Sequence, residues 1–165
     1  MPQLISPTTD LHGAWLDAHE EWGPGPHEDG FGLESEDEVR SPAGFAAWVA
    51  RLDSESDQIS YWWIVENGRV LGGIALRHKD TDYVRWAGHI GFGVIPSARR
   101  RGLASWALRL VLDEARAHGI SRVLIVCATD NTASAKTIER AGGVFETIRD
   151  TEHGPVRRYW AQTTH

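Results

Sequence analysis

The chain has 165 residues, a length typical of one domain; 41% of them are hydrophobic and 24% are charged. This ordinary globular composition excludes a disordered chain, a collagen-like repeat and a low-complexity array. The charge is unevenly distributed. Residues 1–60 contain 13 Asp/Glu and 2 Lys/Arg, a net charge of −11, whereas residues 61–165 contain 10 and 15, a net charge of +5. We therefore expect the two parts to bind groups of different charge. Nucleic-acid binding is not expected, because the basic residues are thinly spread apart from one triplet.

The cysteine and histidine content and the N-terminal sequence indicate where such a chain would reside. The single cysteine, Cys127, cannot form an intramolecular disulfide, which fits a reducing compartment. The 8 histidines occur as isolated residues without zinc-binding spacing, so no metal is expected. The N-terminus lacks the charged and apolar regions of a signal peptide, and no apolar run approaches the roughly 20 residues that cross a bilayer. We expect a cytoplasmic protein with no membrane partner.

The first 60 residues predict two helices joined by an acidic, glycine-rich loop. A short apolar start at Leu4 and Ile5 precedes the first helix. Thr9 or Asp10 can cap that helix, and apolar residues then recur at helical spacing as far as Trp22. Ser41 and the following proline are a typical N-cap and first-turn pair for the second helix, whose apolar face extends to residue 52.

From residue 61 the pattern changes to strands. Residues 61–65 and 70–76 predict a β-hairpin, because Asn67-Gly68 supplies the positive φ angles of a type I′ turn. A strand over 88–95 contains three glycines, which indicate a bulge or a close backbone approach. Residues 102–118 and 130–141 predict helices, 122–128 a buried central strand, and 144–148 and 157–161 two further strands. The order predicts one mixed α/β domain over 1–165, with a central sheet of about seven strands flanked by about four helices.

The segment with the clearest chemistry leads from the glycine-bearing strand through a basic loop into a helix. Arg99, Arg100 and Arg101 precede the helix N-terminus, where unpaired N–H groups and the helix dipole favour an anion. Two nucleotide motifs are excluded. Leu103-Ala104 stand where a P-loop needs Lys-Ser/Thr, and the 91/93 glycine pair comes too early for a dinucleotide fingerprint. The alternative is that the triplet is only a solvated helix start.

The loop has the pattern R-x-x-G-x-A from Arg99 to Ala104, which resembles the acyl-CoA pyrophosphate loop of the GCN5-related N-acetyltransferase (GNAT) superfamily. The resemblance extends to Asn131 with Ser134 after the buried strand, and to residues 138–143. Residues 61–63, 88–92 and 159–160 look like those of one bacterial subgroup. The resemblance to the superfamily covers the chain from about residue 61 to 160. It implies a GNAT-like sheet that is splayed between its fourth and fifth strands.

The resemblance also implies a division of labour and a set of cofactor contacts. Residues 1–60 are the acceptor-side helices, and residues 61–165 are the core that binds acetyl-CoA as the acyl donor. The resemblance implies that the pantetheine arm pairs with the glycine-bearing strand and that the pyrophosphate lies on the amides of the basic loop. It also implies that Asn131 and Ser134 lie near the pantetheine and the sulfur. The cofactor residues implied are Phe92, Gly93, Val94, Arg99, Arg100, Arg101, Gly102, Leu103, Ala104, Ser105, Asn131 and Ser134.

The implied reaction is direct acyl transfer to a primary amine, but the catalytic base and acid are not evident. Family members often carry Glu or His at positions that align with Gly88 and Ile90, so His89 between them is the candidate base or water relay. The alternative is a carboxylate of the front loop: Glu21, Glu28, Asp29 or Glu34. Ile138 stands where the family often has a tyrosine that protonates the departing thiolate. Tyr83 and Tyr159 are candidates for this general acid. Cys127 is expected to be a packing residue.

The acceptor is expected to contact residues 20–40, which contain 8 Asp/Glu. These carboxylates suggest a cationic small-molecule amine, packed on some of the tryptophans Trp22, Trp62, Trp63 and Trp86. The alternatives are an amine of a protein, or a non-catalytic module that binds acyl-CoA. A homodimer is compatible with the sequence, which does not determine the oligomeric state.

Overall fold

The computed structural model describes residues 1–23 and 30–163. The chain forms two compact units, which share β3 and β4. The first unit comprises Met1–Ala75 and Phe92–Leu103, and the second comprises Leu76–Gly91 and Ala104–His165. The hydrogen-bonded strand order is β1-β2-β3-β4-β5-β7-β6, a mixed seven-stranded sheet, as predicted. None of the helices in the described ranges combines the length and the apolar character that a membrane span requires.

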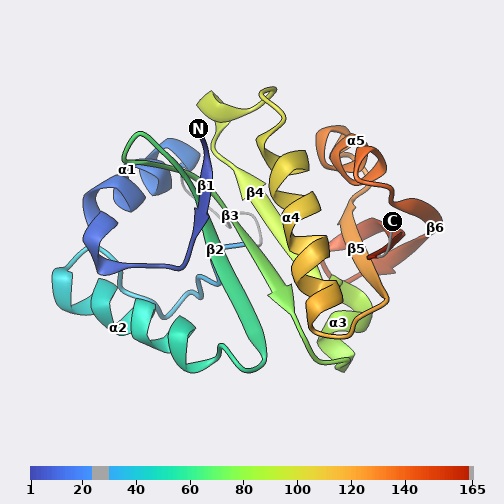
Figure 1. The fold of residues 1–165 in the computed structure, drawn as a ribbon, viewed down its shortest axis with the longest axis horizontal. Coiled ribbons are helices and arrows are strands. Elements are labelled where there is room, and N and C mark those ends of the chain that lie inside the picture. The colour runs from blue at the N-terminus through green and yellow to red at the C-terminus, as the bar shows by residue number, and fades with distance from the viewer. Residues whose placement is uncertain (24–29, 164–165) are drawn as a thin grey trace. The chain divides into compact units, whose positions relative to one another are not determined.

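The first unit contains β1 (Gln3–Ile5), β2 (Ile59–Glu66) and most of β3 (Arg69–Arg77), together with α1 (His12–Trp22) and α2 (Pro42–Ser54). Two short 3-10 helices, η1 (Thr9–Leu11) and η2 (Pro96–Ala98), also belong to it. In Figure 1 the helices α1 and α2, coloured blue to cyan, lie beside β1 and β2 in the left half of the view.

Local sequence signals explain how the elements of the first unit begin and turn. Ser41 caps α2, because its hydroxyl accepts a 3.0 Å hydrogen bond from the Gly44 N–H. The turn between β2 and β3 has positive φ at both central residues, 53° at Asn67 and 75° at Gly68. This pair of angles confirms the predicted type I′ hairpin.

An aromatic core joins the two helices of the first unit to its strands. The rings of Trp15, Phe45, Trp48 and Trp63 contact one another, with centroid distances from 4.7 Å for Trp15–Trp48 to 6.1 Å for Phe45–Trp63. All four are at most 2% exposed. Trp63 is therefore a core residue and is not available to an acceptor.

Glycines allow a close backbone approach on β3. A Cβ at Gly72 would overlap the carbonyl oxygen of Gly93 in β4, and a Cβ at Gly73 would lie 2.6 Å from the Phe31 ring. A Cβ at Gly30 would lie 3.2 Å from the Phe92 Cα. The Gly30-Phe31 part of the acidic segment therefore lies against β3 and β4 within the first unit.

The second unit is built on β5 (Arg122–Ala128), the predicted buried strand, in which Val123, Leu124 and Ile125 are at most 2% exposed. β7 (Gly154–Gln162) pairs antiparallel with both β5 and the edge strand β6 (Val144–Thr151). The helices are α4 (Leu103–Ala117), α5 (Thr132–Arg140) and α3 (Asp82–Ala87). α3 was not predicted, because its six residues are too few to show a helical period; Thr81 caps it by accepting from the Val84 N–H.

The pairing between β4 (Ile90–Val94) and β5 is parallel and very short. It comprises the pair Ile90–Ile125, and Gly88 forms an isolated antiparallel bridge to the same Ile125. The ladder stops after that one pair, which is the splay between the fourth and fifth strands that was predicted. Gly88 has a φ of 87°, and a Cβ there would lie 2.8 Å from the Leu124 carbonyl oxygen. The glycine at this irregularity is thus required by both conformation and space.

Candidate active site

The basic loop of the first unit is fastened to the end of β4. The Arg99 Nε donates a 3.0 Å hydrogen bond to the Val94 carbonyl oxygen, and the backbone N–H of Arg99 donates to the Pro96 carbonyl oxygen. Arg100 and Gly102 both have left-handed backbone, with φ of 64° and 76°. This conformation costs a non-glycine residue free energy, so the turn at Arg100 is maintained by its surroundings.

The three arginines of the loop differ in what they contact. The Arg101 Nη2 lies 2.6 Å from the Glu66 Oε1 in β2, and this hydrogen bond lowers the pKa of Glu66. Arg99 contacts the backbone, as described above. Arg100 is exposed and has no partner within the described residues. Arg100 is therefore the arginine whose charge is most available to a bound anion.

Backbone donors are also available in this loop. The N–H groups of Arg100, Arg101 and Gly102 donate to no protein acceptor in the described part of the chain. They lead directly into α4, a 15-residue helix whose first turn carries the positive end of the helix dipole. Within the first unit, N–H groups and a guanidinium without partners among the described residues are donors of the kind that bind a phosphate group.

Glu21, one of the predicted alternative bases, anchors η2. Its two carboxylate oxygens accept hydrogen bonds of 2.8 Å each, from the N–H and from the hydroxyl of Ser97. The hydrogen bond from the Ser97 backbone lowers the pKa of Glu21, which makes it a weaker base. Glu21 thus links the end of α1 to the loop that precedes α4. A contact between residues 76 positions apart has no signal in the sequence, and sequence reasoning missed it.

His89, the predicted base, is bound into the backbone of the second unit. Its N–H donates to the Leu124 carbonyl oxygen at 2.7 Å, and its Nδ1 accepts from the Leu124 N–H at 2.9 Å. The proton of the neutral ring is therefore assigned to Nε2. Burial lowers the pKa of His89, and the Arg77 charge lowers it further against the opposing effect of Asp80. The lone pair that a base would use is already occupied by a main-chain N–H.

The polar pair of the second unit lies at the start of α5. Asn131 is the N-cap, and its Oδ1 accepts a 3.1 Å hydrogen bond from the Ser134 N–H. Both residues are half-buried, so each retains some accessible surface. Ile138, which replaces the tyrosine common in the family, is fully buried and packs in the core.

The surroundings of Tyr159, Tyr83 and Cys127 make these side chains poorly suited to proton transfer. The Tyr159 hydroxyl donates to the Glu139 Oε2 at 2.8 Å, and burial together with this carboxylate raises the pKa of Tyr159 to about 12. Tyr83 is exposed, and the Arg77 guanidinium lies 4.7 Å from its ring centroid. Burial raises the pKa of the Cys127 thiol, which agrees with its predicted packing role.

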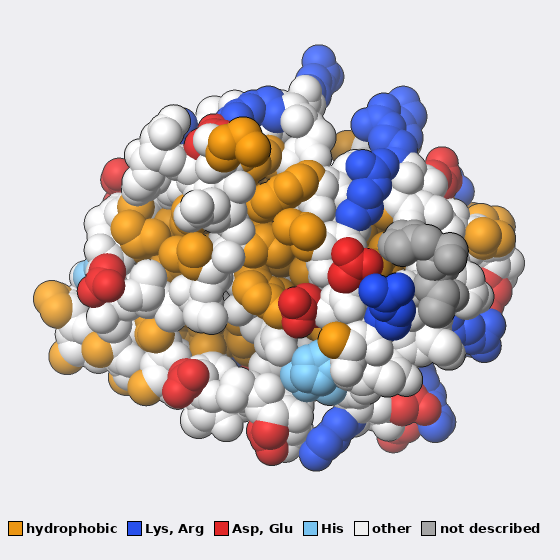
Figure 2. Space-filling view, in the orientation of Figure 1, with side chains coloured by type: hydrophobic (Ala, Val, Ile, Leu, Met, Phe, Trp, Pro, Cys, Tyr) orange, Lys and Arg blue, Asp and Glu red, His pale blue; other side chains and the backbone are white. Residues whose placement is uncertain are grey.

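Much of the acidic segment is paired within the first unit. Arg51 forms ion pairs with Asp37 at 2.7 Å, Glu55 at 3.0 Å and Glu34 at 3.8 Å. Arg40 pairs with Glu20 at 3.1 Å. Glu28 and Asp29, two of the predicted bases, lie outside the described residues. On the face shown in Figure 2, few basic side chains lie over α1 and α2.

The expected cofactor positions are divided between the two units. Phe92, Gly93, Val94 and residues 99–103 belong to the first unit, whereas residues 104–105, Asn131 and Ser134 belong to the second, as does the candidate base His89. Within the described ranges, no three His, Cys, Asp or Glu side chains are grouped so as to hold a metal ion.

A mixed α/β sheet with a short, splayed β4–β5 pairing defines the class of fold to which the chain belongs. The sequence profile of the acetyltransferase (GNAT) family matches residues 12–143, so the chain belongs to this family and is an acetyltransferase. Among curated proteins, none matches the chain in sequence.

Solved structures share the fold at low sequence identity. Ribosomal-protein-S5-alanine acetyltransferase from Vibrio fischeri is 14% identical with a TM-score of 0.76, over 98% of this chain and 93% of that one. RimJ from Mycobacterium smegmatis, in complex with CoA-disulfide, is 15% identical with a TM-score of 0.75, over 98% and 81%. YncA from Salmonella typhimurium, with its cofactor acetyl-CoA, is 16% identical with a TM-score of 0.66, over 99% and 95%.

Proposed function

We propose that the protein transfers an acetyl group from acetyl-CoA directly to the primary amine of a cationic small molecule. The observation that carries this proposal is the loop before α4, where, among the described residues, three N–H groups have no protein acceptor and the Arg100 side chain has no partner. The pyrophosphate of acetyl-CoA supplies the anion that such a site favours. The backbone of Phe92, Gly93 and Val94 would bind the pantetheine arm in the manner of an added strand.

The reaction requires an uncharged amine. An alkylamine with a pKa near 10.4 is neutral in only about one molecule in 2,500 at pH 7. Its nitrogen attacks the thioester carbonyl carbon, the carbon–sulfur bond breaks, and the amine loses a proton as the thiolate leaves. Backbone N–H groups of β4 can stabilise the oxyanion that develops on the carbonyl oxygen. A proton acceptor would accelerate this step by about 10²–10⁴-fold.

The hydrogen bonds at the candidate bases narrow the choice of proton acceptor. His89 could accept a proton on Nδ1 only by giving up the Leu124 N–H. We infer that His89 is a positioning residue, which holds β5 next to the irregular start of β4. Water or an acceptor-side carboxylate then takes the proton. Glu34 is the described candidate, because it is exposed and its ion pair with Arg51 is long, at 3.8 Å.

The acceptor class is supported by charge and by position. Residues 1–60 have a net charge of −11, which attracts cations. The acidic segment reaches the cofactor strand, since Gly30 lies against Phe92 within the first unit. A second candidate is an amine of a protein, because structural neighbours include ribosomal-protein acetyltransferases of Vibrio fischeri and Vibrio cholerae.

The test is release of CoA thiol from acetyl-CoA in the presence of amine panels. One panel contains polyamines and aminoglycosides, and the other contains short peptides with free N-termini or lysine side chains. We expect turnover with the cationic small molecules, with kcat/KM falling as salt rises from 20 to about 200 mM, because screening weakens steering. Turnover with peptides alone would replace the small molecule by a protein acceptor. Tight CoA binding without acceptor-dependent thiol release would indicate a binding module instead.

A further inference from the structure

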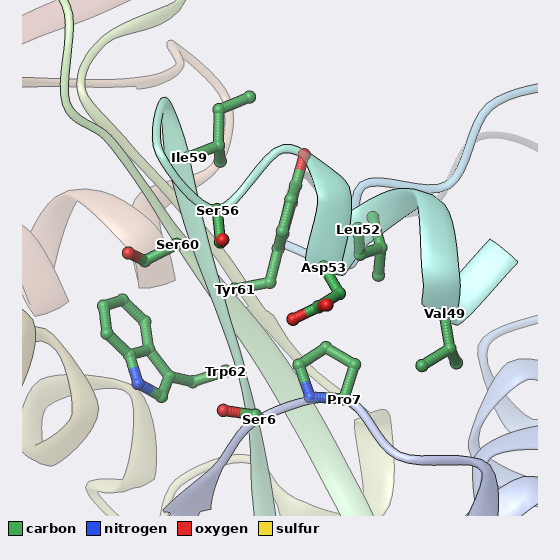
Figure 3. A pocket seen from close by; sticks show the side chains of 10 residues that line it. All are labelled: Ser6, Pro7, Val49, Leu52, Asp53, Ser56, Ile59, Ser60, Tyr61 and Trp62. Atoms are coloured by element: carbon green, nitrogen blue, oxygen red, sulfur yellow. The ribbon is translucent and has the colours of Figure 1, made fainter.

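The first unit contains a cavity of about 140 Å³ that the proposed reaction does not use. It lies where the loop after β1, the second half of α2 and the start of β2 meet (Figure 3). Its lining residues are Ser6, Pro7, Val49, Leu52, Asp53, Ser56, Ile59, Ser60, Tyr61 and Trp62. None of them belongs to the expected acetyl-CoA site, and β3 lies between β2 and β4 in the sheet.

Among the described residues that line the cavity, Asp53 is the one with a charged side chain. The Asp53 carboxylate has no hydrogen-bond or ion-pair partner among the residues that the structure describes. Figure 3 shows its side chain directed toward the space between Tyr61 and Pro7. A bound cation would therefore not have to displace an existing protein partner from Asp53.

The rest of the lining suits an organic cation better than a metal ion. Tyr61 lies on the α2 side of β2, the side of Asp53, whereas Ser60 and Trp62 extend from the other side of the strand, so Tyr61 supplies the aromatic ring next to the carboxylate (Figure 3). Aromatic faces attract ammonium groups. Apolar side chains from α2, Val49 and Leu52, provide a surface for an alkyl chain.

We propose that this cavity binds a primary alkylammonium group, with the nitrogen at Asp53 and Tyr61 and the alkyl chain against Val49 and Leu52. The volume is close to that of an engineered cavity of about 150 Å³ that holds benzene, so it accommodates about six heavy atoms. Butylammonium has this size, and so does the side chain of lysine. The ammonium can therefore belong to a free amine or to a lysine of a polypeptide.

The experiment is an amide-resolved NMR titration of the full-length protein without acetyl-CoA, so that the outcome is independent of acetyl transfer. The probes are butylammonium, the lysine derivative Nα-acetyl-lysine methylamide, and n-butanol as the uncharged control. D53N removes the charge at nearly constant shape, and D57N removes a nearby exposed carboxylate that does not line the cavity. Circular dichroism verifies that both variants fold.

We expect butylammonium to shift the amide signals of Asp53, Ser56, Tyr61 and Trp62 with a millimolar Kd. D53N raises that Kd at least fivefold, D57N changes it less than twofold, and n-butanol binds at least fivefold more weakly. If the lysine derivative binds as well as butylammonium, the ammonium group that the cavity binds belongs to a polypeptide. If only butylammonium binds, the ligand is a free amine. Equal binding of butylammonium and n-butanol, or equal Kd values for D53N and D57N, would overturn the proposal. So would shifts confined to other parts of the chain.

Discussion

The hydrogen bond between the Leu124 N–H and the His89 Nδ1 separates a positioning role for His89 from a catalytic one. In H89A the Leu124 N–H loses its acceptor, and Leu124 is only 2% exposed. An unsatisfied buried donor costs about 1–3 kcal/mol. In H89N the Oδ1 occupies nearly the position of Nδ1 and can accept the same hydrogen bond, but it cannot take up a proton.

The magnitude can be measured by thermal unfolding. For a chain of this size each kcal/mol lowers Tm by about 2–4 °C, so H89A should melt about 2–12 °C below the wild type. H89N should recover more than half of that loss. If His89 only positions the strands, kcat of H89N stays within about threefold of the wild type, whereas loss of a general base lowers it by about 10²–10⁴-fold.

The same pair of variants predicts a dependence of stability on pH. Burial lowers the pKa of His89 in the folded state, so the unfolded state takes up its proton at a higher pH. The unfolding free energy of the wild type should therefore decrease as pH falls below about 6.5, the ordinary value for histidine. H89N should lack this component, and H153N, at an exposed histidine, should retain it. A stable H89N whose kcat falls 100-fold would refute the positioning role, and so would an H89N as unstable as H89A.

Three further outcomes are expected. R100Q should weaken CoA binding about tenfold or more by calorimetry, since hydrogen bonds to charged groups contribute about 1.5–3 kcal/mol; R116Q, in the last turn of α4, should leave binding unchanged. G72A should lower the unfolding free energy by about 1–3 kcal/mol in urea, because its methyl group would overlap the Gly93 carbonyl oxygen; wild-type stability would contradict this approach of β3 to β4. One of the 3 tyrosines should titrate by absorbance near pH 12, and Y159F should remove that transition. Because the pKa of Tyr159 is raised in the folded state, its stabilisation is complete below about pH 10 and is lost as pH rises toward 12.

Features that depend on neighbouring residues could be predicted from the sequence. The Asn67-Gly68 turn, the Ser41 cap and the buried strand over 122–128 each follow from local conformational preference or from an apolar run. The basic loop could be proposed as an anion site from sequence alone, because such a site at a helix N-terminus needs only consecutive residues. α3 could not be predicted, since six residues show no period and its ends depend on the Thr81 cap.

The partners of the charged and titratable side chains could not be predicted in the same way. His89 and Leu124 are 35 residues apart, and Arg101 and Glu66 are also 35 apart. The sequence does not distinguish the three loop arginines, whereas the fold pairs Arg101 with Glu66 and leaves Arg100 without a partner among the described residues.

By itself, the sequence determined the family, the order of the strands and of every helix except α3, and the position of the basic loop. These depend on hydrophobic periodicity, turn chemistry and a short motif, all of which act over a few residues. Only the tertiary structure decided which side chains remain free for chemistry. It binds Glu21 to Ser97 and His89 to Leu124, and it leaves the Asp53 carboxylate without a partner among the described residues. The reason is physical: the protonation and availability of a side chain depend on the groups within a few ångströms, and folding brings those groups from distant parts of the chain.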